Sequence, residues 1–161
     1  MTNTQPLIQQ YLQSHNVLCL ATATDNLPWV APVFYASDDT GLIFLSAPHT
    51  RHCKNIALNP NVSASIQQEY SEWQDIKGLQ LEGIVRRVSD ANRARVIDRY
   101  ALKFPITGDQ APPEIAKAID KIQWFYLIVR KMFYIDNSKG LGHREEGNVA
   151  DLFPKSFLVV R

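Results

Sequence analysis

The sequence predicts a mostly β, antiparallel barrel with short covering helices, and three observations support this fold class. Short β-rich segments follow one another between turn residues, at residues 17–24, 27–37 and 42–46. Helical patterns interrupt the strands only occasionally, without the regular alternation that a parallel sheet requires. Closing such strands into a barrel removes the sheet edges that invite aggregation. The 161 residues are 45% hydrophobic, so we expect one domain over residues 1–161.

The first half of the chain is predicted to contain a helix, a three-stranded meander and a second helix. Apolar residues recur at helical spacing over residues 6–12, after which the meander begins. The second strand of the meander contains Pro28 and Pro32. Proline cannot donate a ladder hydrogen bond, so we expect this strand to be bent or to lie at an edge. The second helix is expected over residues 51–58, ending before Asn59-Pro60.

The second half is predicted to contain more strands and two further helices. We expect strands at residues 62–68, 79–88, 123–129 and 132–135, helices at residues 91–103 and 113–121, a glycine-containing loop at residues 137–143, and packing of residues 157–160 on the body. Gly83 interrupts the second of these strands. A glycine in mid-strand predicts a β-bulge or a close approach by another backbone.

Composition excludes several classes of protein. The net charge is +1, so no overall field attracts nucleic acid or an anionic membrane. The longest apolar-rich stretch, residues 122–129, has the length of a strand, and the N-terminus lacks the features of a signal peptide. We therefore expect a cytoplasmic protein with neither a nucleic acid nor a membrane as its partner. Cys19 and Cys53 do not make a disulfide framework, and we expect both to be reduced.

The start of the helix at residues 51–58 is the most informative segment for function. Thr50, Arg51, His52 and Lys54 cluster there. A helix N-terminus presents unpaired N–H groups and a partial positive charge. A hydroxyl and two permanent cations at that position suit a phosphate group. A solvated first turn with Thr50 as its cap explains the same pattern equally well.

Other reactive groups in the sequence form no established catalytic or metal-binding pattern. His49, His52 and Cys53 do not have a standard zinc-ligand spacing, so we expect no metal site. No nucleophile elbow or triad motif is present, so we predict no catalytic side chain. Lys139 and His143 lie in the predicted glycine-containing loop and Arg144 directly follows it; they suit an anionic ligand, but a surface role is the favoured interpretation.

Four segments, in order along the chain, resemble those of one known superfamily. They are His15-Asn16-Val17-Leu18, Thr50-Arg51-His52 with Asn59-Pro60, GLQLEGIVRRVSD at residues 78–90, and FYIDNSKGLGH at residues 133–143. Together they are similar to the pyridoxamine-phosphate-oxidase-like superfamily of FMN-binding split β-barrels, and most of all to a small bacterial branch of it. The resemblance implies a homodimer that holds FMN in a groove between its subunits.

The resemblance also implies which residues contact the flavin. Pro32, Val33, Phe34, Leu45 and Ser46 would line the isoalloxazine ring, largely through backbone groups; Thr50, Arg51, His52 and Lys54 would hold the phosphate; Gln80 would come from the partner subunit; and Tyr134 would approach the flavin from the late strand. His52 is a departure, because a lysine or serine is commoner at its position in the superfamily.

Function follows from the resemblance less directly than fold. Gly142-His143-Arg144 stands in place of the Arg-x-His-like substrate motif, so the resemblance does not extend to oxidation of pyridoxamine phosphate. Some members of the superfamily bind a deazaflavin or haem. The leading hypothesis is an FMN-dependent oxidoreductase with an unidentified small-molecule substrate. The alternatives are a non-catalytic flavin or haem carrier or sensor, with His49, His52 or His143 as the haem ligand, and a cofactor-free dimer with an interaction role.

Overall fold

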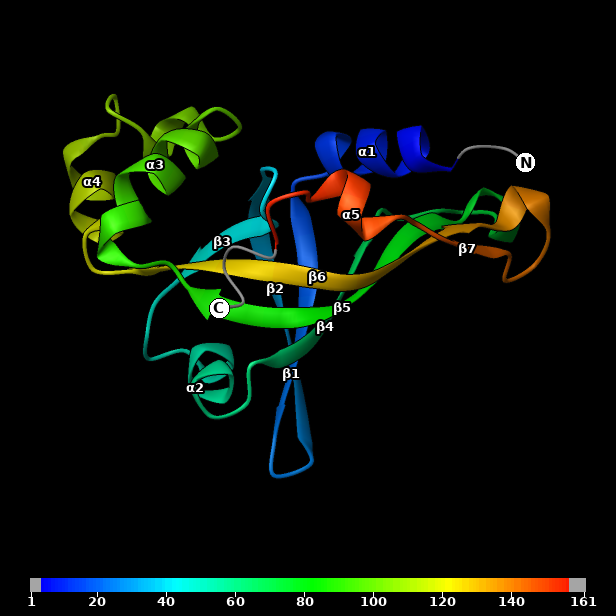
Figure 1. Cartoon of the computed structure of the whole chain (residues 1–161), viewed down its shortest axis with the longest axis horizontal. Coiled ribbons are helices and arrows are strands. Elements are labelled where there is room, and N and C mark those ends of the chain that lie inside the picture. The colour runs from blue at the N-terminus through cyan, green and yellow to red at the C-terminus, as the bar shows by residue number, and fades with distance from the viewer. Residues whose placement is uncertain (1–3, 157–161) are drawn as a thin grey trace.

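The strands of the protein form the predicted antiparallel barrel in a computed structural model that describes residues 4–156 (Figure 1). They are β1 (Val17–Thr24), β2 (Leu27–Ser37), β3 (Leu42–Ser46), β4 (Asn61–Gln67), β5 (Lys77–Arg87), β6 (Gln123–Asp136) and β7 (Arg144–Glu146). The sheet order is β3-β2-β1-β4-β5-β6-β7, and β3 also pairs with β6. This last pairing closes the first six strands into a barrel and leaves β7 as an extra strand beside β6.

The helices cover separate parts of the barrel. They are α1 (Gln5–Ser14), α2 (Arg51–Leu58), α3 (Asp90–Ala101), α4 (Pro113–Ile119) and the short α5 (Val149–Leu152). Figure 1 shows α1 and α5 together on one side, α3 and α4 as a lobe beside β3, and α2 on the opposite side near the β1–β2 hairpin. Ile8, Leu12 and Ile56 bring α1 and α2 into the barrel core, while Val96 and Ile119 pack the lobe onto a second core outside the barrel.

The late part of the chain differs from the prediction. The two strands expected at residues 123–129 and 132–135 are one continuous strand, β6. The polar pair Arg130-Lys131 indicated a break, but the ladder with β5 continues past it with a shift of register next to Gly83. The strand β7 and the helix α5 were not predicted. The predicted packing of residues 157–160 lies outside the described residues.

Gly83 confirms the expected close backbone approach. A Cβ atom at this position would lie 2.3 Å from the carbonyl oxygen of Ile128 on β6. The register shift between Glu82 and Gly83 is the β-bulge, which increases the local twist and bends the strand. The bulge therefore lets β5 and β6 stay paired around the curve of the barrel.

The prolines of β2 also lie where the sequence predicted them to be tolerated. Pro28 and Pro32 pair with β1 on one side, whereas β3 pairs with β2 only at residues 35–37. The remainder of β2 is thus an edge, on which a missing N–H donor costs little. Val30, at 57% exposed, and Phe34, at 59%, point outward from this segment with Pro32, whereas Trp29, at 40%, lies on the same face as the buried Ala31 and Val33 and stays partly exposed.

Lys103 ties the helical lobe to the end of α1. Its ammonium group donates to the carbonyl oxygens of Leu12 and His15 and lies 4.2 Å from the centre of the Tyr35 ring. Carbonyl groups at a helix C-terminus carry partial negative charge and accept from a cation favourably. Burial nevertheless disfavours the charged form and lowers the pKa of Lys103 from 10.5 to about 8.

This shift predicts a pH-dependent stability. Between about pH 8 and 10.5 the unfolded chain keeps the proton of Lys103 while the folded chain has released it. Stability rises with pH wherever the unfolded state binds more protons, so Lys103 adds stability as pH rises through this range. We expect urea unfolding from pH 7 to 9.5 to show this rise in the wild type and a smaller one in Lys103→Met. An exposed control, Lys131→Met, should keep the wild-type slope, and equal slopes in all three proteins would contradict the assignment.

Candidate functional site

A cluster of two hydroxyls and one imidazole lies where β3 leaves the sheet and α2 begins. Ser46 Oγ is 2.6 Å from His52 Nε2, and Thr50 Oγ1 is 3.2 Å from the same nitrogen. His52 is buried, with 8% of its surface exposed, and burial lowers its pKa. The last residue of a strand, the residue before a helix and the second helical residue are thus brought together by one short turn.

The first turn of α2 keeps its backbone donors free. The amide of Lys54 bonds to the carbonyl oxygen of Thr50, so the three amides before it have no partner within the helix. The Thr50 hydroxyl does not cap them and donates instead to the carbonyl oxygen of Ala47. The structure therefore differs from the interpretation of Thr50 as an ordinary side-chain cap, and it leaves unpaired N–H groups beside the hydroxyl cluster.

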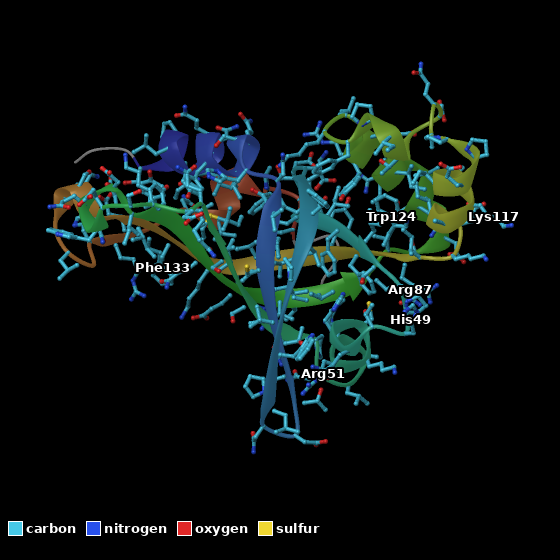
Figure 2. All side chains as sticks on the ribbon, turned by 180° about the vertical axis from the view of Figure 1, so that it is seen from behind. His49, Arg51, Arg87, Lys117, Trp124 and Phe133 are labelled. Atoms are coloured by element: carbon cyan, nitrogen blue, oxygen red, sulfur yellow. The ribbon has the colours of Figure 1, made fainter. Side chains whose placement is uncertain are left out.

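The two permanent cations of α2 are exposed, and one of them is held by an aromatic ring. The guanidinium carbon of Arg51 lies 4.5 Å from the centre of the Trp29 ring on β2. Such a stack stabilises a cation while leaving its N–H donors at the edge accessible. Figure 2 shows Arg51 extending toward the β1–β2 hairpin, with His49 on the other side of α2. Lys54 is exposed one turn further along the helix.

The outer face of β2 continues from this helix start as an apolar surface. Pro32 and Phe34 point outward, and Phe34 packs edge-on against Phe104 with ring centres 5.4 Å apart. Val33 points into the barrel core and Leu45 packs against the second core, so each can offer only its backbone to a ligand here. This arrangement is compatible with the predicted contacts, which were largely through backbone groups.

Gln80 lines a groove that runs over β1, β4, β5 and β6 and is named here the Gln80 groove. Its volume is about 350 Å³, and its lining includes Cys19, Ala21, Val30, Ser65, Gln80, Phe133 and Arg144. The Arg144 guanidinium lies 4.5 Å from the Phe133 ring centre and donates to Gln80 Oε1 at 3.3 Å. Small side chains form the floor, and polar or aromatic side chains form one wall.

The structure corrects the role predicted for Tyr134. Its side chain is 4% exposed and packs in the barrel core, with its ring 5.9 Å from that of Tyr11. Successive side chains of a strand point to opposite faces, so the neighbouring Phe133 faces the groove instead. Trp29, Phe133 and Arg144 are site residues that sequence reasoning did not assign to the flavin. The alternation along β6 was a signal that pointed to Phe133, whereas Trp29 gave no signal of its own.

An antiparallel barrel with a cation- and hydroxyl-rich helix start after its third strand defines a class of split-barrel proteins. The chain belongs to the pyridoxamine 5'-phosphate oxidase family, whose model matches residues 4–134. A UPF0306 protein of Photorhabdus laumondii is 33% identical over 103 residues, which are 63% of this chain and 72% of that protein. The resemblance seen in the sequence motifs is thereby confirmed.

Solved structures with the same fold have diverse descriptions. A conserved hypothetical protein of Mycobacterium tuberculosis has a TM-score of 0.71 at 20% identity, and the superposition covers 89% of this chain and 91% of that protein's chain. A FAD-binding protein of Mesorhizobium loti has a TM-score of 0.61 at 21% identity, with coverages of 77% and 88%. HutZ, the haem storage protein of Vibrio cholerae, has a TM-score of 0.63 at 19% identity, with coverages of 82% and 94%. At these identities the likeness shows the fold alone.

The described part of the chain contains neither a membrane-spanning helix nor a metal-binding cluster. Within residues 4–156 no helix is long and apolar enough to cross a membrane. In the same part of the chain no three His, Cys, Asp or Glu side chains gather closely enough to hold a metal ion.

Proposed function

We propose that this protein binds FMN and acts as a flavin-dependent oxidoreductase on a small molecule. The observation that carries the proposal is the juxtaposition of a phosphate-type site and an apolar face. Hydroxyls, free amides and the cations Arg51 and Lys54 gather at the start of α2, directly after β3, and Pro32 and Phe34 point outward from β2, the strand that pairs with β3. A phosphorylated, flat, largely apolar cofactor needs these two surfaces side by side.

The chemistry required of the protein is then modest. When bound, a flavin supplies the hydride or electron transfer, and the protein supplies position and electrostatics. Arg51 and Lys54 would neutralise the phosphate, and the Ser46 hydroxyl and the unpaired amides of the first helical turn would donate to its oxygens. This division of roles agrees with a sequence that contains no recognisable catalytic acid, base or nucleophile.

We also propose that the functional unit is a homodimer whose partner subunit covers the outer face of β1 and β2. Val17, Val30 and Phe34 leave apolar surface exposed along this face, and Val30 also lines the Gln80 groove. Contiguous exposed apolar surface marks an interaction site on soluble proteins. The partner's Gln80 groove would then face the flavin held at the start of α2.

Removing the phosphate cations should weaken FMN binding. Each charge-assisted hydrogen bond contributes about 1.5–3 kcal/mol, so we expect Arg51→Ala combined with Lys54→Ala to raise the Kd for FMN by roughly 100-fold or more. Quenching of flavin fluorescence on titration measures this constant. The matched control is Arg95→Ala with Lys117→Ala, which removes two exposed cations from α3 and α4 and should leave the Kd unchanged. Unchanged affinity in the first variant would remove the phosphate assignment.

A charge on the apolar face should separate the subunits. We expect Val30→Glu to convert a two-chain species into a folded monomer and to lose FMN, because an unpaired carboxylate is costly to bury in an interface. Light scattering after size-exclusion chromatography measures the mass. Leu102→Glu, at a position 74% exposed on the helical lobe, should remain dimeric. A monomeric wild type that still binds FMN would overturn the dimer proposal and leave the cofactor proposal standing.

Haem is the competing cofactor, because HutZ and a Mycobacterium smegmatis protein described as haem-binding share the fold. Three of the four histidines make contacts that disfavour haem ligation, whereas His49 is exposed in the turn before α2 and remains available as a ligand. His143 Nε2 is 2.7 Å from Glu145 Oε1, His15 stacks on Tyr11, and His52 bonds to hydroxyls. Haem ligation by any of these three histidines would require its hydrogen bond or ring stack to break.

An absorbance spectrum distinguishes the two cofactors. We expect the purified protein, after addition of FMN and desalting, to retain about one FMN per chain and to show flavin bands. Addition of haem should give no Soret band that depends on His143 or His52. A Soret band that survives in His52→Ala and disappears in His143→Ala would favour the haem-binding alternative.

A further inference from the structure

His52 is the buried member of the proposed phosphate site, and its contacts define how protons are arranged there. Its Nε2 atom is 2.6 Å from Ser46 Oγ and 3.2 Å from Thr50 Oγ1, while the two hydroxyl oxygens are 3.4 Å apart. The three groups therefore form one network in which each proton has few alternative positions. The inference below rests on the proposed binding of a phosphate at this cluster.

The hydroxyl of Thr50 has one proton, which it donates to the carbonyl oxygen of Ala47. Toward His52, Thr50 can then act only as an acceptor. Ser46 has two options. It donates to Nε2 when that nitrogen is unprotonated, and its proton is then used within the network. It accepts from Nε2 when that nitrogen carries a hydrogen, and its own proton is then available to a ligand.

A histidine that is protonated on both nitrogens satisfies this second arrangement and adds a positive charge. The Nε2–H group donates to the hydroxyl oxygens, and the Ser46 O–H is free to donate to a phosphate oxygen. Without an anion the charged form is disfavoured, because His52 is buried and no charged side chain offsets its desolvation. A bound phosphate supplies the missing counter-charge at close range.

The surroundings of His52 leave the phosphate as the main source of negative charge. The strands against which α2 packs, β1 and β2, carry no acidic or basic side chain, and Cys19 and Tyr35 are their titratable groups. The helix itself contributes Arg51, Cys53 and Lys54, the preceding turn His49, and the end of β5 Arg86 and Arg87, which line a cavity with Cys53. All the charged groups among these are cations.

We propose that His52 binds the phosphate monoester of FMN in its protonated form, so that the anion enters the site together with one proton. The proton is taken up from solvent onto the imidazole, and no covalent bond changes. A lysine at this position would supply a permanent charge. Here the charge appears only when the ligand is present, and where Nε2 was unprotonated before, the Ser46 hydroxyl then donates to the phosphate instead of to Nε2.

The first test follows the imidazole directly. The Cε1–H resonance of His52, assigned by its loss in His52→Asn, is titrated in the apoprotein, with inorganic phosphate and with FMN. We expect an apoprotein pKa below 6.5 and an upward shift of about one unit or more with either ligand, since an adjacent opposite charge favours the charged form. His49, exposed in the preceding turn, serves as the internal control and should shift less. No shift of His52 with FMN bound would overturn the inference.

The second test measures FMN affinity from pH 5.5 to 8.5 in the wild type, His52→Lys, His52→Asn and the control His49→Asn. The phosphate itself titrates near pH 6, so each Kd is divided by that of His52→Lys, which carries a permanent charge. We expect the wild-type ratio to rise with pH by up to about tenfold per unit, as uptake of one proton requires. The His49→Asn ratio should follow the wild type, and the His52→Asn ratio should be flat and high.

The outcomes separate this inference from the proposed function. FMN binding with a pH-independent ratio in the wild type overturns the role of His52 and leaves the flavin proposal intact. Failure of FMN to bind, with inorganic phosphate still shifting the His52 resonance, overturns the flavin proposal and supports the proton-coupled anion site. Absence of both effects overturns both.

Discussion

The pairing of β6 with β3 is the constraint on which the rest of the molecule depends. β6 pairs with β5 over residues 125–136 except Arg130, with β3 over residues 123–127 and with β7 over residues 133–135. A long strand that joins β5 to β3 in this way must follow the curve of a closed barrel. The bulge at Gly83 allows that curve, because a bulge bends and twists the strand. Glycine is needed there, since a Cβ atom would collide with the carbonyl oxygen of Ile128.

Closure also positions the candidate site. Ser46 pairs with Gln123 at the start of β6, so the chain leaves the barrel at a fixed point, and α2 begins only a few residues later. Ile56 anchors that helix in the barrel core. The hydroxyl of Ser46 and the ring of His52 therefore meet through rigid elements at both ends of the turn. A site built on such elements holds its geometry better than one carried by a free loop.

Much of this architecture is predictable from the sequence because local signals and global fold agree. Alternation and turn residues place the strands of the meander, and the prolines of β2 correctly indicate an edge. The composition at Thr50 and Arg51 predicts an anion site, and this stays a prediction. The continuous course of β6 was not predictable from the chain alone, because the polar pair Arg130-Lys131 imitates a turn. The bulge that accommodates it depends on the partner strand, and local periodicity carries no information about a partner.

The direction of individual side chains sets the other limit on prediction. Val33 and Tyr134 occupy positions expected near a flavin, yet both point into the barrel, and their neighbours Phe34 and Phe133 point out. A strand that is assigned to a site contributes only every second side chain to it, so an error of one residue exchanges core for surface. Trp29 could not be predicted as a site residue for a different reason. Its importance comes from lying under Arg51, a residue 22 positions away along the chain in an element of another type.

The division between core and surface decides which side chains can contact a cofactor. The residues proposed to hold a cofactor form no catalytic motif: they are a proline, a phenylalanine, two residues with hydroxyls and a few exposed cations. A redox cofactor supplies reactivity, so the protein needs charge, shape and exclusion of water more than it needs a reactive side chain. Within this set His52 differs, because its charge depends on its surroundings. Function in such a barrel is therefore argued from the residues on its outward faces and at its helix starts, and the closed sheet alone does not specify it.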